Sequence, residues 1–105
     1  MTHNYETVYI LKPDLTEDVM KKINSKILEI LARRGGKLLD QKDLGKKMLA
    51  YKISHQNRGH YFQLNFEGSG PVIEDLEKNL RLTEEVLRFL TVRPVQEKEE
   101  GGVQI

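Results

Sequence analysis

"AYKISHQNRGHYFQLNF", residues 50–66, has the pattern of two β-strands joined by a polar turn. Its second half alternates two sets of side chains, as a strand with one buried face does. One set is His60, Phe62, Leu64 and Phe66, and the other is Tyr61, Gln63, Asn65 and Glu67. The first half continues a strand-forming run that begins at residue 37. We therefore predict a β-hairpin with strands at 37–53 and 60–67, a turn at 54–59, and a bulge or bend near Gly45.

Segments with helical periodicity flank the hairpin on both sides. The upstream segment, residues 13–36, repeats apolar side chains at three- and four-residue steps, and Thr16 is a favourable N-cap. A Gly-Gly pair ends it. The downstream segment, residues 68–82, carries Pro71 at the first helical position. Both segments predict helices that bury one apolar stripe.

Two further strands complete the chain. Residues 5–11, "YETVYIL", are largely apolar on both alternating faces, which is typical of a central strand, and residues 86–93, "VLRFLTVR", form the last strand. With right-handed crossovers, the order βαββαβ predicts a four-stranded antiparallel sheet of order 4-1-3-2. Both helices then cover one face, in the ferredoxin-like α+β arrangement. We predict one domain over residues 1–93 and a disordered polar tail over 94–105.

The composition excludes several classes of protein. A chain of 105 residues has room for one core, and the absence of cysteine excludes disulfides and thiolate metal sites. The N-terminus lacks the pattern of a signal peptide, and no apolar run approaches the roughly 18 residues of a bilayer span. These features predict a cytoplasmic protein that does not engage a membrane.

One face of the predicted sheet is left open. Tyr5, Tyr9 and Leu11 form the bulkier set of the first strand, and we expect them beneath the helices. Val8 and Ile10 then lie on the open face. Because monomers rarely leave large apolar patches in contact with water, we predict that Val8 and Ile10 meet a protein partner.

Acidic residues are missing from the hairpin. No Asp or Glu occurs between Asp43 and Glu67, whereas four of the 17 Lys and Arg residues lie between 44 and 66. That segment carries a charge of +4 and the rest of the chain −3. Such asymmetry is typical of an electrostatic footprint for a polyanion. The alternative is a lysine-bearing strand that discourages pairing between the edges of separate sheets.

Catalytic interpretations find little support. The three histidines have no acids or cysteines near them in the sequence that would complete a metal site. There is no glycine-rich phosphate loop and no G-x-S-x-G motif. The carboxylate pairs Glu84-Glu85 and Glu99-Glu100 fall in a turn and in the tail, where nothing would shift their pKa. We therefore predict no enzyme, no cofactor, no metal and no small-molecule substrate.

An RNA-recognition motif has the same topology and is the alternative binding module. Its third strand follows the pattern K/R-G-F/Y-G/A-F-V-x-F/Y. Arg58, Gly59 and Phe62 match this pattern, but His60 and Tyr61 do not. This alternative predicts a free-standing protein that binds single-stranded RNA by stacking bases on exposed aromatic side chains.

Several short motifs, in their order and spacing, resemble the bacterial ribosomal protein S-six (S6) family from about residue 4 to residue 93. "LGKKMLAYKI", residues 44–53, is similar to the most recognisable stretch of that family. Gly59-His60-Tyr61 resembles the start of its third strand. Leu80-Arg81-Leu82 and "VLRFLTVR" resemble its closing helix end and strand.

This resemblance implies a non-catalytic binder of small-subunit ribosomal RNA. It implies a partnership with ribosomal protein S-eighteen (S18), the two docking together on the central domain of the RNA. The acid-free hairpin would then face phosphates, and the open sheet face would receive the protein partner. The side chains predicted to contact RNA are Lys46, Lys47, Lys52, His55 and Arg58, with Arg88 and Arg93 on the last strand as a second group.

Overall fold

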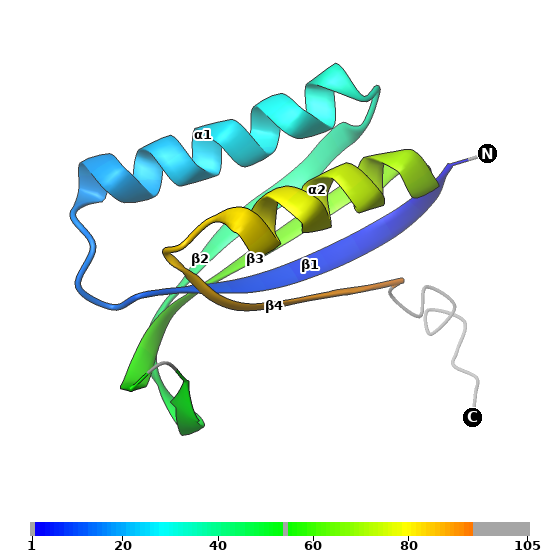
Figure 1. Cartoon of the computed structure of the whole chain (residues 1–105). Coiled ribbons are helices and arrows are strands. Elements are labelled where there is room, and N and C mark those ends of the chain that lie inside the picture. The colour runs from blue at the N-terminus through cyan, green and yellow to red at the C-terminus, as the bar shows by residue number, and fades with distance from the viewer. Residues whose placement is uncertain (1, 54, 94–105) are drawn as a thin grey trace, which may run out of the picture.

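The computed structural model describes residues 2–53 and 55–93 and has the predicted element order. The elements are β1 (His3–Leu11), α1 (Glu17–Arg33), β2 (Lys37–Ile53), β3 (Gln56–Gly68), α2 (Gly70–Leu82) and β4 (Val86–Val92). The strands form one antiparallel sheet in the order β2-β3-β1-β4, which is the predicted 4-1-3-2 order. Both helices lie on the same face of the sheet (Figure 1). The predicted tail, residues 94–105, lies outside the described residues.

Local hydrogen bonds begin and end α1 where the sequence predicts. The Thr16 hydroxyl accepts a hydrogen bond from the Val19 N–H at 3.3 Å, as an N-cap does. After the last turn, Gly35 has φ +79°, a left-handed conformation that glycine adopts without steric cost. The Gly36 N–H then donates to the Leu31 carbonyl at 2.7 Å. Neither described helix has the length and apolar character that a membrane crossing requires.

The central strand β1 supplies one face to the core. Tyr9 and Leu11 are fully buried there, and Tyr5 packs against the same cluster. The other buried members of this cluster are Ile27, Leu31, Phe62, Leu64, Phe66, Val72, Leu76 and Leu80. These residues come from α1, β3 and α2, so the prediction that Tyr5, Tyr9 and Leu11 lie beneath the helices is confirmed.

A buried hydroxyl group ties three elements together. The Tyr9 hydroxyl donates to Oδ1 of Asn24 in α1 at 2.7 Å and accepts from Nε2 of Gln41 in β2 at 3.1 Å. Burial raises the pKa of Tyr9 to about 12; the Gln41 hydrogen bond acts in the opposite direction, and the nearby charge of Asp43 adds to the rise. Tyr9 is therefore held as a neutral phenol.

The β2–β3 hairpin is longer than predicted. Ile53 pairs with Gln56, so only two residues connect the strands, whereas the sequence predicted a turn at 54–59. His55 has φ +68°, the left-handed conformation that two-residue hairpin connections favour. The polar residues after His55 belong to the exposed end of β3. Their polarity reflects that exposure, and this is why they resembled a turn.

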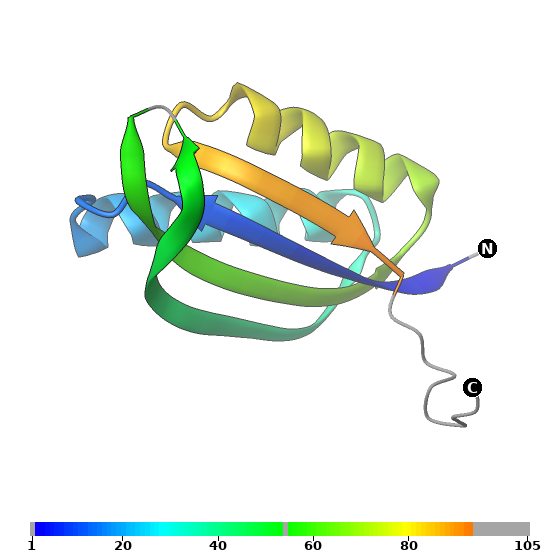
Figure 2. The same cartoon turned by 90° about the horizontal axis from the view of Figure 1, so that it is seen from below.

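The long strand β2 is irregular. Its register against β3 shifts between Leu38 and Asp40, between Asp43 and Gly45, and between Met48 and Ile53. Gly45 has φ +84°, which confirms the predicted irregularity at this residue. Beyond Gly45 the hairpin bends away from the helices and toward the open face of the sheet (Figures 1 and 2). We call residues 44–53 and 55–59 the hairpin end.

The bent hairpin end covers part of the open face. Ile10 is only 8% exposed and Leu49 only 9%. A Cβ atom built on Gly59 would lie 2.3 Å from Cγ2 of Ile10, so Ile10 packs against bare backbone. Ile10 thus lies on the open face, as predicted, but little of its side chain is left for a partner to contact. Strand alternation assigned Ile10 to the correct face, but it does not report that the hairpin folds back over that face.

Gly59→Ala is expected to destabilise the protein by about 1–3 kcal/mol, because the added methyl group overlaps a branched carbon of Ile10. Urea unfolding of the two proteins measures this difference. Ile10→Ala removes the overlapping carbon, so the double variant should lose less stability than the two single variants added together. Additive losses would show that Gly59 and Ile10 do not touch.

Candidate nucleic-acid interface

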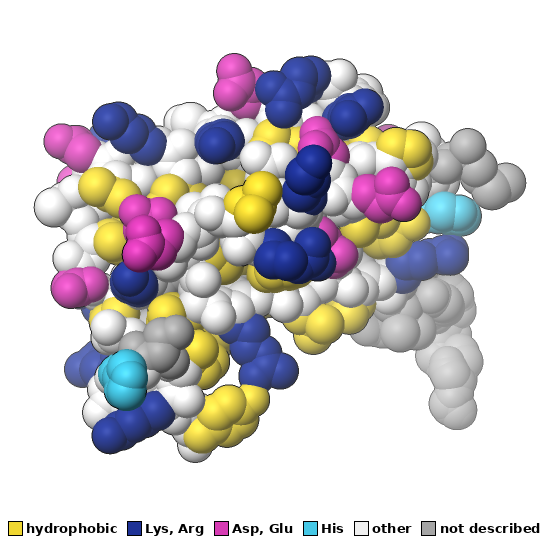
Figure 3. All heavy atoms as spheres, in the orientation of Figure 1, with side chains coloured by type: hydrophobic (Ala, Val, Ile, Leu, Met, Phe, Trp, Pro, Cys, Tyr) yellow, Lys and Arg dark blue, Asp and Glu magenta, His cyan; other side chains and the backbone are white. Residues whose placement is uncertain are grey.

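The structure gathers five of the predicted RNA-binding residues at the hairpin end. They are Lys46, Lys47, Lys52, His55 and Arg58, and all are exposed. None of the ion pairs between described residues includes any of them, so no described carboxylate neutralises their charge. At the visible tip of the hairpin in Figure 3, basic and histidine side chains lie beside hydrophobic ones, and no acidic side chain is seen there.

These five side chains do not share one face. Lys47 lies over the open face, where its ammonium nitrogen is 5.4 Å from the centroid of the Tyr61 ring. Lys46 pairs with His60 in the ladder and, as the neighbour of Lys47, points to the opposite side. The positive charge therefore forms a ridge with basic side chains on both sides.

Arg88 lies beside the hairpin end, and Arg93 lies away from it. The Arg88 guanidinium donates a hydrogen bond to the Tyr51 hydroxyl and lies 5.9 Å from the centroid of that ring. This contact joins β4 to the hairpin end across the open face. Arg93 follows the far end of β4, where Val92 pairs with Glu6. The two arginines therefore do not form one group.

An apolar groove of about 440 Å³ runs between the hairpin end and the open face. Val8 and Ile10 line it from β1, Tyr51 lines it from the hairpin end, and Leu90 lines it from β4. Leu90 and Tyr51 are 64% and 61% exposed, so the groove has apolar side-chain surface that is accessible to water. The sequence analysis did not single out Leu90, although alternation along β4 places it on the same face as Arg88.

Asp43 and His60 connect β2 to β3 at the base of the hairpin end. Nε2 of His60 lies 2.6 Å from Oδ1 of Asp43, which also accepts a hydrogen bond from the Gly45 N–H at 2.9 Å. Partial desolvation raises the pKa of Asp43, but the hydrogen bonds from His60 and Gly45 outweigh it and hold that pKa below its ordinary value. His60 has no acid near it in the sequence, but antiparallel pairing brings Asp43 to it from 17 positions away.

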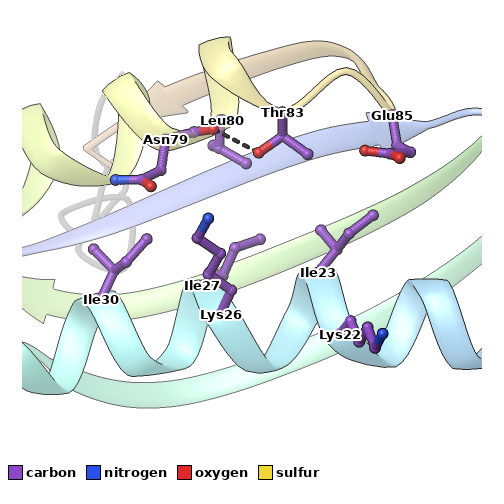
Figure 4. A pocket seen from close by; sticks show the side chains of 9 residues that line it. All are labelled: Lys22, Ile23, Lys26, Ile27, Ile30, Asn79, Leu80, Thr83 and Glu85. Atoms are coloured by element: carbon purple, nitrogen blue, oxygen red, sulfur yellow. Dashed lines mark hydrogen bonds between the residues drawn. The ribbon is translucent and has the colours of Figure 1, made fainter.

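A smaller hollow of about 210 Å³ lies on the other side of the sheet, between α1 and α2 (Figure 4). Ile23 and Ile27 from α1 and Leu80 from α2 give it an apolar lining, and Lys22 and Lys26 lie beside them. Both lysines are exposed, so this hollow has the character of a gap between two helices. Within residues 2–53 and 55–93, no three His, Asp or Glu side chains are grouped to hold a metal ion.

The sequence is similar to those of known ribosomal proteins. Residues 4–93 match the family described as Ribosomal protein S6. The chain belongs to the ribosomal protein S6 family. The small ribosomal subunit protein bS6 of Synechococcus elongatus is 47% identical over 89 residues, which cover 85% of this chain and 83% of that protein. The bS6 protein of Gloeobacter violaceus is 40% identical over 93 residues, which cover 89% and 97%.

A solved S6 structure has the same architecture. The crystal structure of 30S ribosomal protein S6 from Thermotoga maritima has a TM-score of 0.85 with 26% identity, covering 95% of this chain and 94% of that one. The predicted resemblance to S6 and the predicted sheet order are thus confirmed. As a member of the S6 family, the protein is a non-enzymatic ribosomal protein of the cytoplasmic ribosome. The assignment of individual residues to RNA or to a protein partner stays a prediction.

Proposed function

We propose that this S6-family protein binds the central domain of small-subunit ribosomal RNA through the hairpin end, together with S18 seated in the apolar groove. The observation that carries the proposal is the exposed basic ridge on a segment without acidic residues. None of the described ion pairs uses its lysines or its arginine. Their charge is therefore available to phosphates.

Phosphate contacts suit the shape of this ridge. Lysine and arginine side chains that neutralise phosphates release condensed counterions, which supplies much of the affinity for nucleic acid. Because Lys46 and Lys47 point to opposite sides, one hairpin can contact phosphates on both of its flanks. Contacts of this kind set the position of the protein on RNA and do not read the bases.

The apolar groove beneath the hairpin end supports a protein partner on the open face. Burying an apolar side chain fully contributes roughly 1.5–3 kcal/mol, before association costs reduce it. Leu90 and Tyr51 are exposed enough to gain from such burial. Since the hairpin end forms one wall of the groove, S18 seated there would touch the same element that carries the RNA-binding lysines. Binding of RNA should then be tighter with S18 than without it.

Replacement of Lys46, Lys47, Lys52 and Arg58 by Gln in one variant tests this function. Each lost phosphate contact lowers the slope of log affinity against log salt concentration by about one unit, so we expect a fall of up to about four units. The measurement is a titration of a central-domain RNA fragment at several salt concentrations in the presence of S18.

A variant with the same charge loss elsewhere is the control. It replaces the exposed helical residues Lys21, Lys22, Lys26 and Lys78 by Gln. We expect its salt slope to stay close to that of the wild type. If the hairpin variant also kept the wild-type slope, we would conclude that these lysines discourage pairing between the edge strands of separate sheets.

The free-standing RNA-recognition module has less support. Such a module exposes aromatic side chains on its sheet for base stacking. Tyr9 and Phe62 are 0% and 4% exposed, because they face the helices, and Lys47 lies over the ring of Tyr61. Equal RNA affinity with and without S18, together with a preference for short single strands, would favour this alternative.

A further inference from the structure

A chain of contacts runs from the core to the base of the hairpin end. The ring of Tyr9 stacks on Phe62 with centroids 5.4 Å apart, and Phe62 stacks on His60 with centroids 4.6 Å apart. Nε2 of His60 meets Oδ1 of Asp43 at 2.6 Å, and the same oxygen accepts the Gly45 N–H. A buried imidazole ring thus connects the packed core to the bulge at which β2 changes direction.

The two nitrogens of His60 have different surroundings. Nδ1 is buried and has no hydrogen-bond partner among the described residues, whereas Nε2 makes the short contact to Asp43. A buried polar atom without a partner is unfavourable, so its presence calls for a physical reason. The contact of Nε2 with Asp43 supplies one, because a wholly apolar ring could fill the same space without that cost but could not hold the carboxylate.

We propose that Asp43 and His60 are positioning residues for RNA binding. Their contact holds the bulge at Gly45 and thereby sets the direction in which the hairpin end carries its basic ridge. Lys46 lies opposite His60 in the ladder, and Arg58 lies two residues before it, so both lie directly beyond the contact. This inference rests on the proposed function, since RNA affinity is its readout.

The sign of the expected effect separates positioning from simple electrostatics. Asp43 is an anion beside a surface for a polyanion, so its charge by itself weakens RNA binding. If charge were its only effect, Asp43→Ala and Asp43→Asn would both strengthen binding. If Asp43 positions the hairpin, Asp43→Ala weakens binding by about tenfold. Asp43→Asn keeps an oxygen for the Gly45 N–H and a group that can bond to His60, so it binds about as tightly as the wild type or more tightly.

His60→Phe provides an independent variant. The phenyl ring keeps the stacking on Phe62 and removes the unpartnered nitrogen, so the resistance to urea should be equal to or higher than that of the wild type. It also removes the donor to Asp43, so RNA affinity should fall by about tenfold. The double variant with Asp43→Ala should bind no more weakly than either single variant, because both remove the same contact. If His60 served stability alone, the RNA affinity of His60→Phe would follow its resistance to urea and would not fall.

The experiment titrates a central-domain RNA fragment in the presence of S18 with the full chain and each of these variants. Asp43→Ala is also placed in the variant that lacks the four charges of the hairpin end, where it should change affinity little because nothing remains to be positioned. The positioning role would be overturned if Asp43→Ala lowered RNA affinity tenfold both in the wild type and in the variant that lacks the four charges. It would also be overturned if Asp43→Ala bound RNA as tightly as the wild type. If instead the four charges themselves proved irrelevant to the salt slope, the proposed function would fail, which is a separate result.

Discussion

Ile10→Asp is expected to destabilise the isolated protein by up to about 3–5 kcal/mol. Ile10 is 8% exposed and packs against Gly59 beneath the hairpin end, so a carboxylate there would be almost entirely removed from water. Its cross-strand neighbour Arg88 already donates to the Tyr51 hydroxyl and would have to leave that contact to pair with the new carboxylate. An uncompensated buried charge costs about 3–5 kcal/mol, and a small domain has about 5–15 kcal/mol in total. Circular dichroism in a urea titration measures the loss.

Val8→Asp is the matched control, two residues away on the same face of β1. Val8 is only half-buried, so this variant should keep its fold. It should instead weaken S18 binding by about 10- to 100-fold, the equivalent of one lost apolar side chain of about 1.5–3 kcal/mol. If Ile10→Asp were as stable as Val8→Asp, the hairpin end would not rest on Ile10 in solution.

The second large effect is a loss of folding stability at high pH, caused by ionisation of Tyr9. The pKa of Tyr9 is about 12 in the folded protein and about 10 in an unfolded chain. Above pH 10 the unfolded state loses this proton first, so stability that is fully present below pH 10 is lost as the pH rises to 12. Two pKa units correspond to about 2.7 kcal/mol.

Tyr9→Phe isolates this effect. Near neutral pH the variant should be less stable by about 1–2 kcal/mol, because Asn24 and Gln41 lose their partner. Between pH 10 and 12 the free energy of unfolding should fall more steeply in the wild type, so the two curves converge or cross. All other ionisable groups are the same in the two proteins, so their effects cancel in the difference. Parallel curves would contradict a neutral, buried Tyr9 hydroxyl.

Much of the fold could be predicted from the spacing of apolar side chains and from the positions of glycine and proline. Two-residue alternation identified the strands, and the bulk of Tyr5, Tyr9 and Leu11 identified the face beneath the helices. The irregularity at Gly45 followed from a glycine inside a strand. Each of these signals is local, since it depends on side chains within a few residues of one another.

The groove and the Asp43–His60 contact could not be predicted in this way. Alternation states which face a side chain takes, but it does not state what covers that face. Ile10 is buried because the hairpin bends beyond Gly45. The side-chain contact between Asp43 and His60 depends on a register that shifts at the same bulge. Both features arise from the curvature of the sheet, which no local pattern encodes.

The place of β1 in the sheet has a consequence for how the chain is made. Tyr5 pairs with Phe66, and Glu6 pairs with Val92, so the first strand to be synthesised pairs only with strands that are synthesised much later. At about 5–20 residues per second, some 80 residues take roughly 4–16 s. The α1 helix and the β2–β3 hairpin can form from near neighbours during that time. Each nascent copy therefore exposes β1 without its strand partners until β3 and β4 have been synthesised.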